Sequence, residues 1–175
     1  MLKLILNKKY NPLFNSDARY FIITGGRGSG KSFAVTVFLT LLTMTKGIRI
    51  LFTRFTMTSA HLSIIPEFLE KIGLLGFDEV FSINKKEVVN IKNNSDILFR
   101  GIRTSAGNQT ASLKSLQGIS TWVLDEAEEL VDENIFDTID LSIREKGIHN
   151  RVILILNPVT KEHWIYKRFF EDKGV

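Results

Sequence analysis

The chain of 175 residues contains no cysteine, three prolines and three histidines. The absence of cysteine excludes disulfides and thiolate metal sites, and it suits a reducing compartment. His61, His149 and His163 lack the spacing of metal ligands, so we expect them at the surface or at helix caps. With little proline, 44% hydrophobic and 24% charged residues, the composition indicates an ordered globular protein of one domain.

Long apolar runs are also absent. The longest, Phe33–Met44, is too short to span a bilayer and is interrupted by threonines, so we interpret it as a buried helix. The N-terminal stretch MLKLILNKKY is too short for the core of a signal peptide. We therefore expect no membrane association. The net charge of +4 permits an anionic partner such as DNA without requiring one.

Short apolar runs alternate with longer helical stretches, which predicts an α/β fold with a mostly parallel central sheet flanked by helices. The runs are almost continuously apolar, as in parallel strands that are covered on both faces. The expected strands are Tyr20–Thr24, Ile48–Thr53, Thr121–Leu124 and Arg151–Leu156. The expected helices are Lys31–Lys46, Ala60–Ile72, Glu133–Lys146 and His163–Glu171.

Two further segments are predicted from their polar residues. A hairpin should pair Val88–Lys92 with Ile97–Arg100, because the asparagines between them tolerate the backbone of a tight turn. Ser105–Ser115 is polar and contains glycine, which favours a mobile loop.

Residues 23–32 read ITGGRGSGKS and lie between an apolar strand and a helical run. They satisfy the phosphate-loop pattern GxxxxGKS, in which backbone N–H groups and a helix N-terminus surround phosphate oxygens. We expect Lys31 to contact the β and γ phosphates and Ser32 to hold Mg²⁺. The alternative is a glycine-rich turn with a solvent-facing lysine. The residues expected to bind nucleotide are Gly25, Gly26, Arg27, Gly28, Ser29, Gly30, Lys31 and Ser32.

Arg27 lies inside this loop and places a positive charge near the γ phosphate or a subunit boundary. It could take part in catalysis by sensing nucleotide in its own subunit, or it could link neighbouring subunits. A solvated loop arginine is the alternative.

Residues 121–127 read TWVLDEA, an apolar strand that ends in two adjacent carboxylates. Asp125 can bind the shell of Mg²⁺ while Glu126 polarises the attacking water, and this pair favours an ATPase over a small-molecule kinase. The alternative is a solvated acidic helix start. We assign that surface role to four further acids, namely Glu128, Glu129, Asp132 and Glu133.

The strand Arg151–Leu156 ends in Asn157 and Pro158. An amide at this position can bond to the γ phosphate or to the attacking water, although Asn-Pro is also a common start of a turn. The residues alone leave both interpretations open.

Three motifs occur in a fixed order along the chain. They are YFIITGGRGSGKS, then LKSLQGIS with TWVLDEAEEL, then ILILNPVTKEHWIYKRFF. Together they resemble the ATPase domain of tailed-bacteriophage terminase large subunits, the motors that pump DNA into procapsids. The similarity covers nearly the whole chain. It implies a P-loop NTPase fold of the additional-strand, catalytic-glutamate type, with ATP and Mg²⁺ as cofactors. It also implies that Asn157 couples hydrolysis to movement.

The resemblance further implies partners: double-stranded DNA, the portal protein of the procapsid, the small terminase subunit, and other copies of the chain in a ring of five. The host cytoplasm is the expected location. In such rings a neighbour often supplies a positive charge to the γ phosphate. Candidates for that charge are Arg100, Arg103 and Lys114, each of which could instead be solvated or contact DNA.

Large terminases usually continue into a nuclease domain, whereas this chain stops at Val175, soon after the third motif. We expect residues 1–175 to form one ATPase domain without nuclease activity. Phe14, Arg19 and Tyr20 precede the phosphate loop, where Phe14 or Arg19 could stack on adenine, whereas Tyr20 could simply start the first strand. The sequence does not decide the role of Arg54. A helicase or recombination ATPase, or a P-loop kinase of small molecules, is the alternative function.

Overall fold

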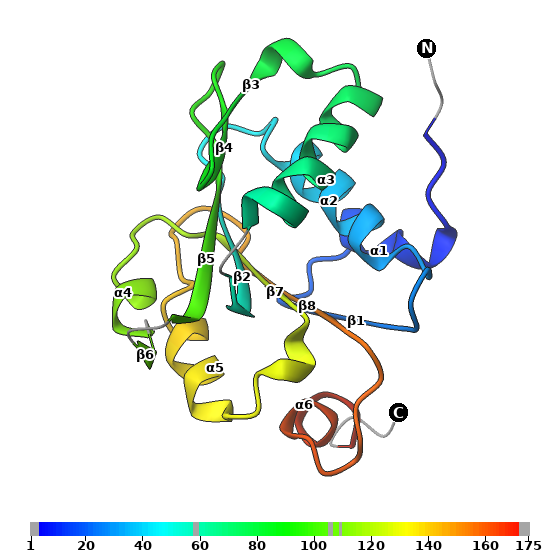
Figure 1. Ribbon diagram of the computed structural model, residues 1–175, viewed down its shortest axis with the longest axis vertical. Helices are drawn as coiled ribbons and strands as arrows, with labels where there is room; N and C mark the ends of the chain where they lie inside the picture. Colours follow the sequence, from blue (N-terminus) through cyan, green and yellow to red (C-terminus); the bar gives the residue numbers. More distant parts are fainter. Residues whose placement is uncertain (1–3, 58–59, 105–106, 109, 172–175) are drawn as a thin grey trace.

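The computed structural model describes residues 4–57, 60–104, 107–108 and 110–171. Eight strands form one sheet in the order β1-β8-β7-β2-β5-β4-β3, and β6 pairs with β5 outside this path (Figure 1). The parallel strands are β1 (Tyr20–Thr24), β2 (Arg49–Thr56), β5 (Asp96–Thr104), β7 (Thr121–Asp125) and β8 (Arg151–Leu156). The antiparallel strands are β3 (Phe81–Ile83), β4 (Glu87–Asn90) and β6 (Gly107–Asn108).

Short and long helical segments connect these strands. The α-helices are α1 (Pro12–Asn15), α2 (Lys31–Leu42), α3 (Ala60–Leu74), α4 (Thr110–Lys114), α5 (Glu133–Asp140) and α6 (Trp164–Tyr166). Helix α6 continues as a π-helical segment, η4 (Lys167–Glu171). Three 3-10 turns complete the list: η1 (Lys8–Tyr10), η2 (Asp78–Val80) and η3 (Ala127–Glu129). Among the described residues, none of the helices has the length and apolar character needed to cross a membrane.

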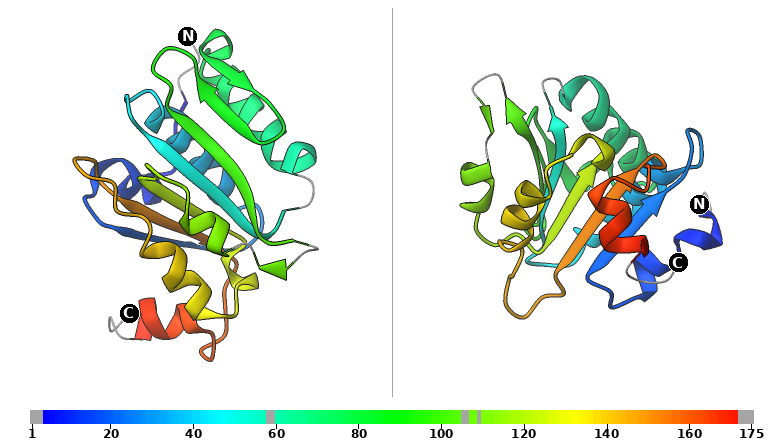
Figure 2. Two further views of the ribbon diagram at one scale, coloured as in Figure 1. Left: turned by 90° about the vertical axis from the view of Figure 1, so that its left-hand side faces the viewer. Right: turned by 90° about the horizontal axis from the view of Figure 1, so that it is seen from below.

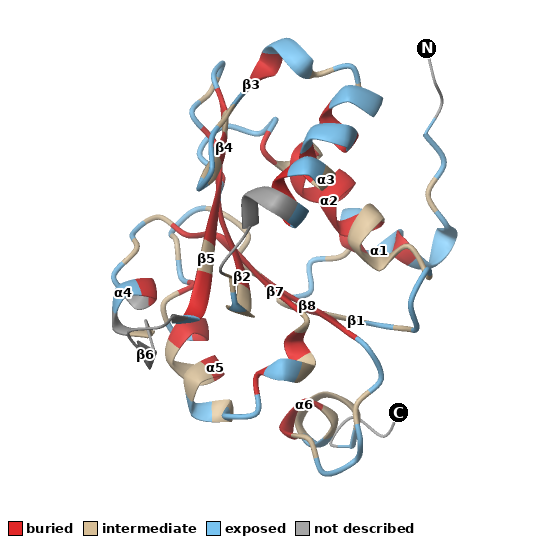
Figure 3. Ribbon diagram, in the orientation of Figure 1, coloured by how far each residue is buried: buried red, intermediate tan, exposed pale blue. Residues whose placement is uncertain are grey.

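The sheet separates two hydrophobic cores (Figures 1 and 2). Helices α2 and α3 pack on one face against side chains such as Val123 and Ile153, and α4, α5 and α6 pack on the other face against Leu124 and Leu154. This division follows from the alternation of side chains along each strand. Because both faces are covered, all of β7 and the residues of β8 after Arg151 are buried (Figure 3).

Strand β8 lies between β1 and β7, so the phosphate-loop strand and the acidic strand are separated by one inserted strand. Thr24 pairs with Leu156, and Ile155 pairs with Asp125, which brings the carboxyl ends of the three strands to the same edge of the sheet. This arrangement confirms the predicted additional-strand P-loop fold. In such sheets ligands bind outside the carboxyl ends of the strands.

The four predicted strands and the hairpin are confirmed, although β2 and β5 continue beyond their predicted ends. In the hairpin, Val88 pairs with Ile97, and Asn94 adopts the left-handed backbone (φ 61°) that the turn requires.

Two predicted helices are shorter than expected. Helix α2 ends at Leu42 rather than Lys46, because the side-chain amides of Asn90 and Asn93 donate to the carbonyl of Thr43 over 3.1 and 3.0 Å. These bonds satisfy carbonyl groups at the helix end.

Helix α5 ends at Asp140 rather than Lys146 for a similar reason. The guanidinium of Arg19 donates to the carbonyls of Asp140 and Ile143, both over 3.1 Å, and to the Asp140 carboxylate over 2.7 Å. In both helices, the residues that terminate the helix are distant in sequence.

The segment Ser105–Ser115 is not a loop throughout. It contains β6 and α4, and the buried side chain of Leu113 anchors α4 in the second core. Residues 105, 106 and 109 lie outside the described residues.

Candidate nucleotide site

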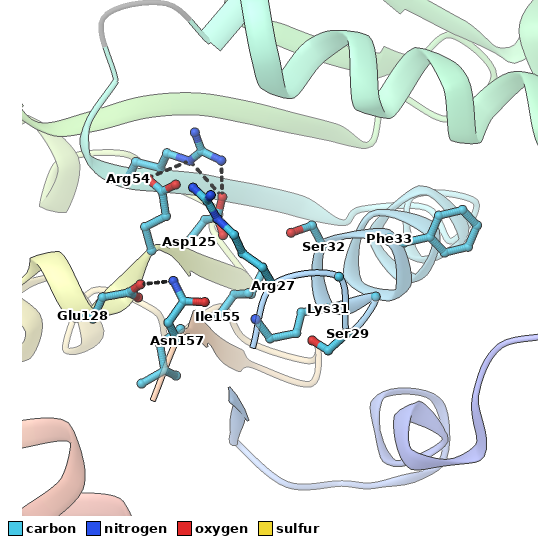
Figure 4. A pocket seen from close by; sticks show the side chains of 14 residues that line it. Arg27, Ser29, Lys31, Ser32, Phe33, Arg54, Asp125, Glu128, Ile155 and Asn157 are labelled. Atoms are coloured by element: carbon cyan, nitrogen blue, oxygen red, sulfur yellow. Dashed lines mark hydrogen bonds and ion pairs between the residues drawn. The ribbon is translucent and has the colours of Figure 1, made fainter. Parts of the chain in front are cut away.

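A pocket of about 340 Å³ opens at the carboxyl ends of β1, β8, β7 and β2 (Figure 4). It brings together residues from the phosphate loop, the acidic strand and the strand that precedes Asn157. The lining residues are Arg27, Gly28, Ser29, Gly30, Lys31, Ser32, Phe33, Arg54, Asp125, Glu126, Glu128, Ile155, Leu156 and Asn157. Four segments that are far apart in the chain thus meet in one site, because Arg54 of β2 joins the other three.

The phosphate loop carries backbone geometry that requires glycine. Gly28 and Gly30 have φ angles of +75° and +82°, which side-chain-bearing residues rarely adopt. Gly30 is the N-cap of α2, and no side chain caps this helix end. The first N–H groups of α2 therefore remain available at the pocket wall, where the helix dipole favours an anion.

Lys31 bonds to the loop that contains it. Its ammonium donates to the carbonyls of Gly25 and Gly26, the second over 3.1 Å. Neither glycine lines the pocket, so their contacts with a nucleotide stay a prediction. Ser29 Oγ is buried and has no hydrogen-bond partner among the described residues, so a phosphate oxygen would supply one.

Tyr10, in the N-terminal segment, makes a hydrogen bond to the phosphate loop that the sequence did not predict. Its side chain is buried, and its hydroxyl donates to the carbonyl of Ser29 over 2.8 Å. Tyr10 and Ser29 are 19 residues apart, and no sequence pattern links them, so the sequence could not predict this contact.

Arg54, at the end of β2, is a second residue whose role the sequence left undecided. Its Nε and Nη2 atoms donate to Asp125 Oδ2 over 2.8 and 2.6 Å, and its Nε lies 3.6 Å from Glu126 Oε2 (Figure 4). Asp125 is buried, and its carboxylate is thus held by a charge-assisted pair. Arg54 consequently lies between the two acids of the pair.

Glu126 directly follows β7 and has a left-handed backbone, with φ 54° and ψ 46°. Such a conformation costs of order 1–2 kcal/mol for a residue with a Cβ, and strain of this kind accumulates at functional sites. Burial raises the pKa of Glu126, and the neighbouring Asp125 adds to this effect while Arg54 opposes it. The carboxylate that we expect to activate water therefore has a raised affinity for a proton.

The charges of Arg54 and Asp125 also influence a third carboxylate, Glu67 of α3. Burial raises the pKa of Glu67; Lys71 and Arg54 counteract this effect, and Asp125 increases it. The electrostatics of the acidic pair thus extend to a helix on the other side of β2.

Asn157 lies at the end of β8, where its amide donates to Glu128 Oε1 over 2.6 Å (Figure 4). Glu128 lines the pocket, so its assignment as a surface charge was wrong. The 3-10 turn η3 directs its side chain back toward β8, which the acidic sequence alone does not reveal. Of the other three acids, Asp132 caps α5, Glu133 pairs with Arg168, and Glu129 is exposed.

The residues present fit a magnesium ion and a nucleotide triphosphate. Ser32 and Asp125 line the same pocket, and a hydroxyl and a carboxylate are ligands that Mg²⁺ accepts together with phosphate oxygens and water. Within the part of the chain that the structure describes, there is no cluster of three or more histidine, aspartate or glutamate side chains that could hold a metal alone.

The residues proposed for adenine are placed differently. Arg19 and Tyr20 lie at the amino end of β1, opposite the phosphate loop, and both side chains bond to Asp140. This geometry argues against adenine contacts for either. Phe14 packs edge-on against Phe38 of α2, with ring centroids 5.1 Å apart, and remains a candidate.

The candidates for a charge given to a neighbouring subunit lie away from the pocket. Arg100 donates to the carbonyls of Phe99 and Lys86 over 2.8 and 3.3 Å, and Arg103 is exposed near the end of β5. The side chain of Lys114 lies outside the described residues. Their role in a ring stays a prediction.

The chain matches a known protein family. A family model described as "Phage terminase large subunit" matches residues 17–174. The PBSX phage terminase large subunit of Bacillus subtilis (strain 168) is 28% identical over 174 residues, which cover 95% of this chain and 38% of that protein. The large terminase subunit of Bacillus phage SPP1 is 24% identical, over 97% of this chain and 43% of that protein. The chain thus spans less than half the length of these relatives.

Solved structures share the fold. The large terminase of a thermophilic bacteriophage matches with a TM-score of 0.76 and 12% identity, over 98% of this chain and 44% of that chain. The same terminase in complex with ADP matches with a TM-score of 0.73 and 11% identity, over 95% and 42% of the two chains. The N-terminal domain of the DNA packaging ATPase from bacteriophage phi29 matches with a TM-score of 0.67 and 16% identity, over 94% and 84%. At these identities the likeness concerns the fold alone.

Proposed function

Because the chain belongs to the phage terminase large subunit family, we propose that residues 1–175 form its single ATPase domain, which hydrolyses ATP to drive packaging of double-stranded viral DNA into a procapsid. The observation that carries this proposal is the one pocket that unites Lys31, Asp125, Glu126 and Asn157. The matching terminase of the thermophilic bacteriophage, which was solved with ADP, supports nucleotide binding.

The phosphate loop would bind and orient the triphosphate. Backbone N–H groups of Gly28 to Ser32 surround phosphate oxygens, and Lys31 exchanges its bonds to the loop carbonyls for bonds to the β and γ phosphates. Mg²⁺, held by Ser32 and Asp125, would neutralise charge on the phosphates. Arg27 lines the pocket and is exposed, so it can approach the γ phosphate from the open side.

Glu126 would orient and polarise the attacking water, and its raised pKa lets it accept a proton from that water. The water oxygen bonds to the γ phosphorus while the bond from that phosphorus to the β-phosphate oxygen breaks, which releases ADP. Arg54 holds the acidic pair in place from β2. Asn157 contacts the water or the γ phosphate from the intervening strand. Catalysis is then a matter of positioning and electrostatic stabilisation, as in other phosphoryl transfers.

We propose that the chain works in the host cytoplasm as part of a ring, five copies in our prediction, docked on the portal of a procapsid and supplied with DNA by the small terminase subunit. Arg100, Arg103 and Lys114 are the candidates for a charge shared between subunits. We expect no nuclease activity from residues 1–175.

ATP hydrolysis measured on the chain with Mg²⁺, alone and with procapsids and DNA, tests the proposal. Lys31→Ala should abolish nucleotide binding and turnover, because it removes the charge that faces the phosphates. Normal turnover in this variant would overturn the assignment, and procapsid-independent strand separation would favour a helicase instead.

A further inference from the structure

We propose that Glu128 is a positioning residue that fixes the orientation of Asn157 and, together with His163, links the nucleotide pocket to helix α6. This inference rests on the proposed ATP hydrolysis and adds two residues that the motifs did not mark. Its parts come from three separate elements: η3, the end of β8, and the N-terminus of α6.

The contact between Asn157 and Glu128 has a defined polarity. An ionised carboxylate only accepts hydrogen bonds, so the Asn157 amide nitrogen must face Glu128 Oε1, 2.6 Å away. The amide oxygen then points away from Glu128, toward the side of the phosphate loop (Figure 4). Asn157 therefore presents an acceptor to the pocket, which suits the O–H of a water better than a phosphate oxygen.

The second carboxylate oxygen of Glu128 strengthens the case that this side chain serves the pocket. Glu128 Oε2 is buried and has no hydrogen-bond partner among the described residues. A buried oxygen of this kind is costly unless a donor reaches it. Since Glu128 lines the pocket, a donor that arrives with the nucleotide or its water can satisfy it.

His163 connects the same turn to α6. Its Nδ1 accepts from the N–H of Ile165 over 3.2 Å and thereby caps α6, so this nitrogen carries no proton. The proton of the neutral ring then resides on Nε2, which donates to the carbonyl of Glu128 over 3.2 Å. Trp164 makes a second bond between α6 and the end of η3, because its indole donates to the carbonyl of Leu130 over 2.5 Å.

These bonds couple both sides of Glu128. Its carboxylate accepts a hydrogen bond from the Asn157 amide at the pocket. Its backbone carbonyl accepts one from His163, the residue that caps α6. A change in the hydrogen bonds of Asn157 when water is consumed can move η3, and the two bonds from η3 and Leu130 carry that movement to α6. Helix α6 would therefore move when the nucleotide is hydrolysed, although it packs on the opposite face of the sheet from α2, the helix that follows the phosphate loop.

Steady-state hydrolysis tests the positioning role. Glu128→Ala should lower kcat by about tenfold with little change in KM, because one hydrogen bond that orients Asn157 is lost. Glu128→Gln should restore most of kcat, since its amide oxygen can still accept from Asn157. Glu129→Ala, an exposed neighbour in the same turn, is the matched control and should resemble the wild type. Wild-type kcat in Glu128→Ala, or equally low kcat in Glu128→Gln, would overturn the proposal.

The link to α6 has a separate readout that needs no turnover. Addition of ATP-γ-S should shift the indole N–H resonance of Trp164 in the wild type. His163→Asn keeps a good helix cap but removes the donor to Glu128, so this variant should bind ATP-γ-S and lose most of that shift. An unchanged shift in His163→Asn refutes the link, whereas the absence of hydrolysis in the wild-type chain with procapsids counts against the proposed function instead.

Discussion

Arg54 holds Asp125 through two nitrogens that share one carboxylate oxygen, at 2.8 and 2.6 Å. The other oxygen of Asp125 stays clear of this pair, and Glu126 lies at 3.6 Å from the same guanidinium. One arginine on β2 therefore contacts both acids, namely the last residue of β7 and the residue that follows it. The acidic motif is completed by a residue 71 positions earlier in the chain.

Arg54→Ala should destabilise the domain by about 2 kcal/mol, because it leaves the buried Asp125 carboxylate without its cation. Arg54→Lys should lower the free energy of unfolding less, since an ammonium keeps the positive charge but cannot donate two hydrogen bonds in the geometry of a guanidinium. Urea unfolding followed by circular dichroism measures both. Equal midpoints for all three proteins would show that this pair contributes nothing to folding.

Glu126→Gln should retain ATP binding and lose turnover by about a hundredfold or more, because an amide cannot take the proton of the attacking water. Binding is measured with a fluorescent ATP analogue and turnover by phosphate release. Glu129→Gln serves as the control for removing one negative charge from the same turn. Unchanged hydrolysis in Glu126→Gln would rule out Glu126 as the group that activates water.

The backbone of Glu126 makes a prediction about stability that is independent of its chemistry. Glu126→Gly and Glu126→Ala both remove the carboxylate, but only glycine adopts φ 54° without strain. Glu126→Gly should therefore be more stable than Glu126→Ala by about 1 kcal/mol. The comparison requires thermal unfolding of the two variants side by side, and a more stable alanine variant would contradict the strained geometry.

Glu67 predicts a dependence of stability on pH. Burial raises its pKa in the folded protein, so the native state binds more protons than the unfolded state between the ordinary and the raised value. The contribution of Glu67 is thus fully present below the ordinary pKa and is lost as pH rises through the raised pKa. Relative to Glu67→Gln, the wild type should become less stable from about pH 4 upward.

Urea midpoints of both proteins across this pH range test the effect of Glu67. Glu79→Gln, a change at an exposed position in η2, provides the control. If the wild type instead gained stability over the variant with rising pH, interactions with Lys71 and Arg54 would outweigh burial.

The sequence predicted the elements whose signals are local. The phosphate loop, the acidic pair and the strands were found because glycine spacing and continuous apolar runs lie within short windows. Glu128 was misassigned because its role depends on how η3 turns, and Tyr10 and Arg54 act through partners that are 19 and 71 residues away. No local pattern records such contacts.

The ends of the helices show the same limit. Lys46 and Gly47 make a good helix stop, yet the asparagines of the β4–β5 turn end α2 earlier by bonding its carbonyls. Arg19 does the same for α5 from the start of β1. Tertiary hydrogen bonds thus decided where helices end, while sequence periodicity decided where they exist.

Strand β8 also separates β1, which leads into the phosphate loop, from β7, which ends in the acidic pair. Neighbouring strands lie about 4.8 Å apart, so one intervening strand sets β1 and β7 at roughly 10 Å. Asn157, which directly follows β8, lines the same pocket as the phosphate loop and the acidic pair. The order of the strands thereby places an amide between a loop that carries a lysine and a pair of carboxylates.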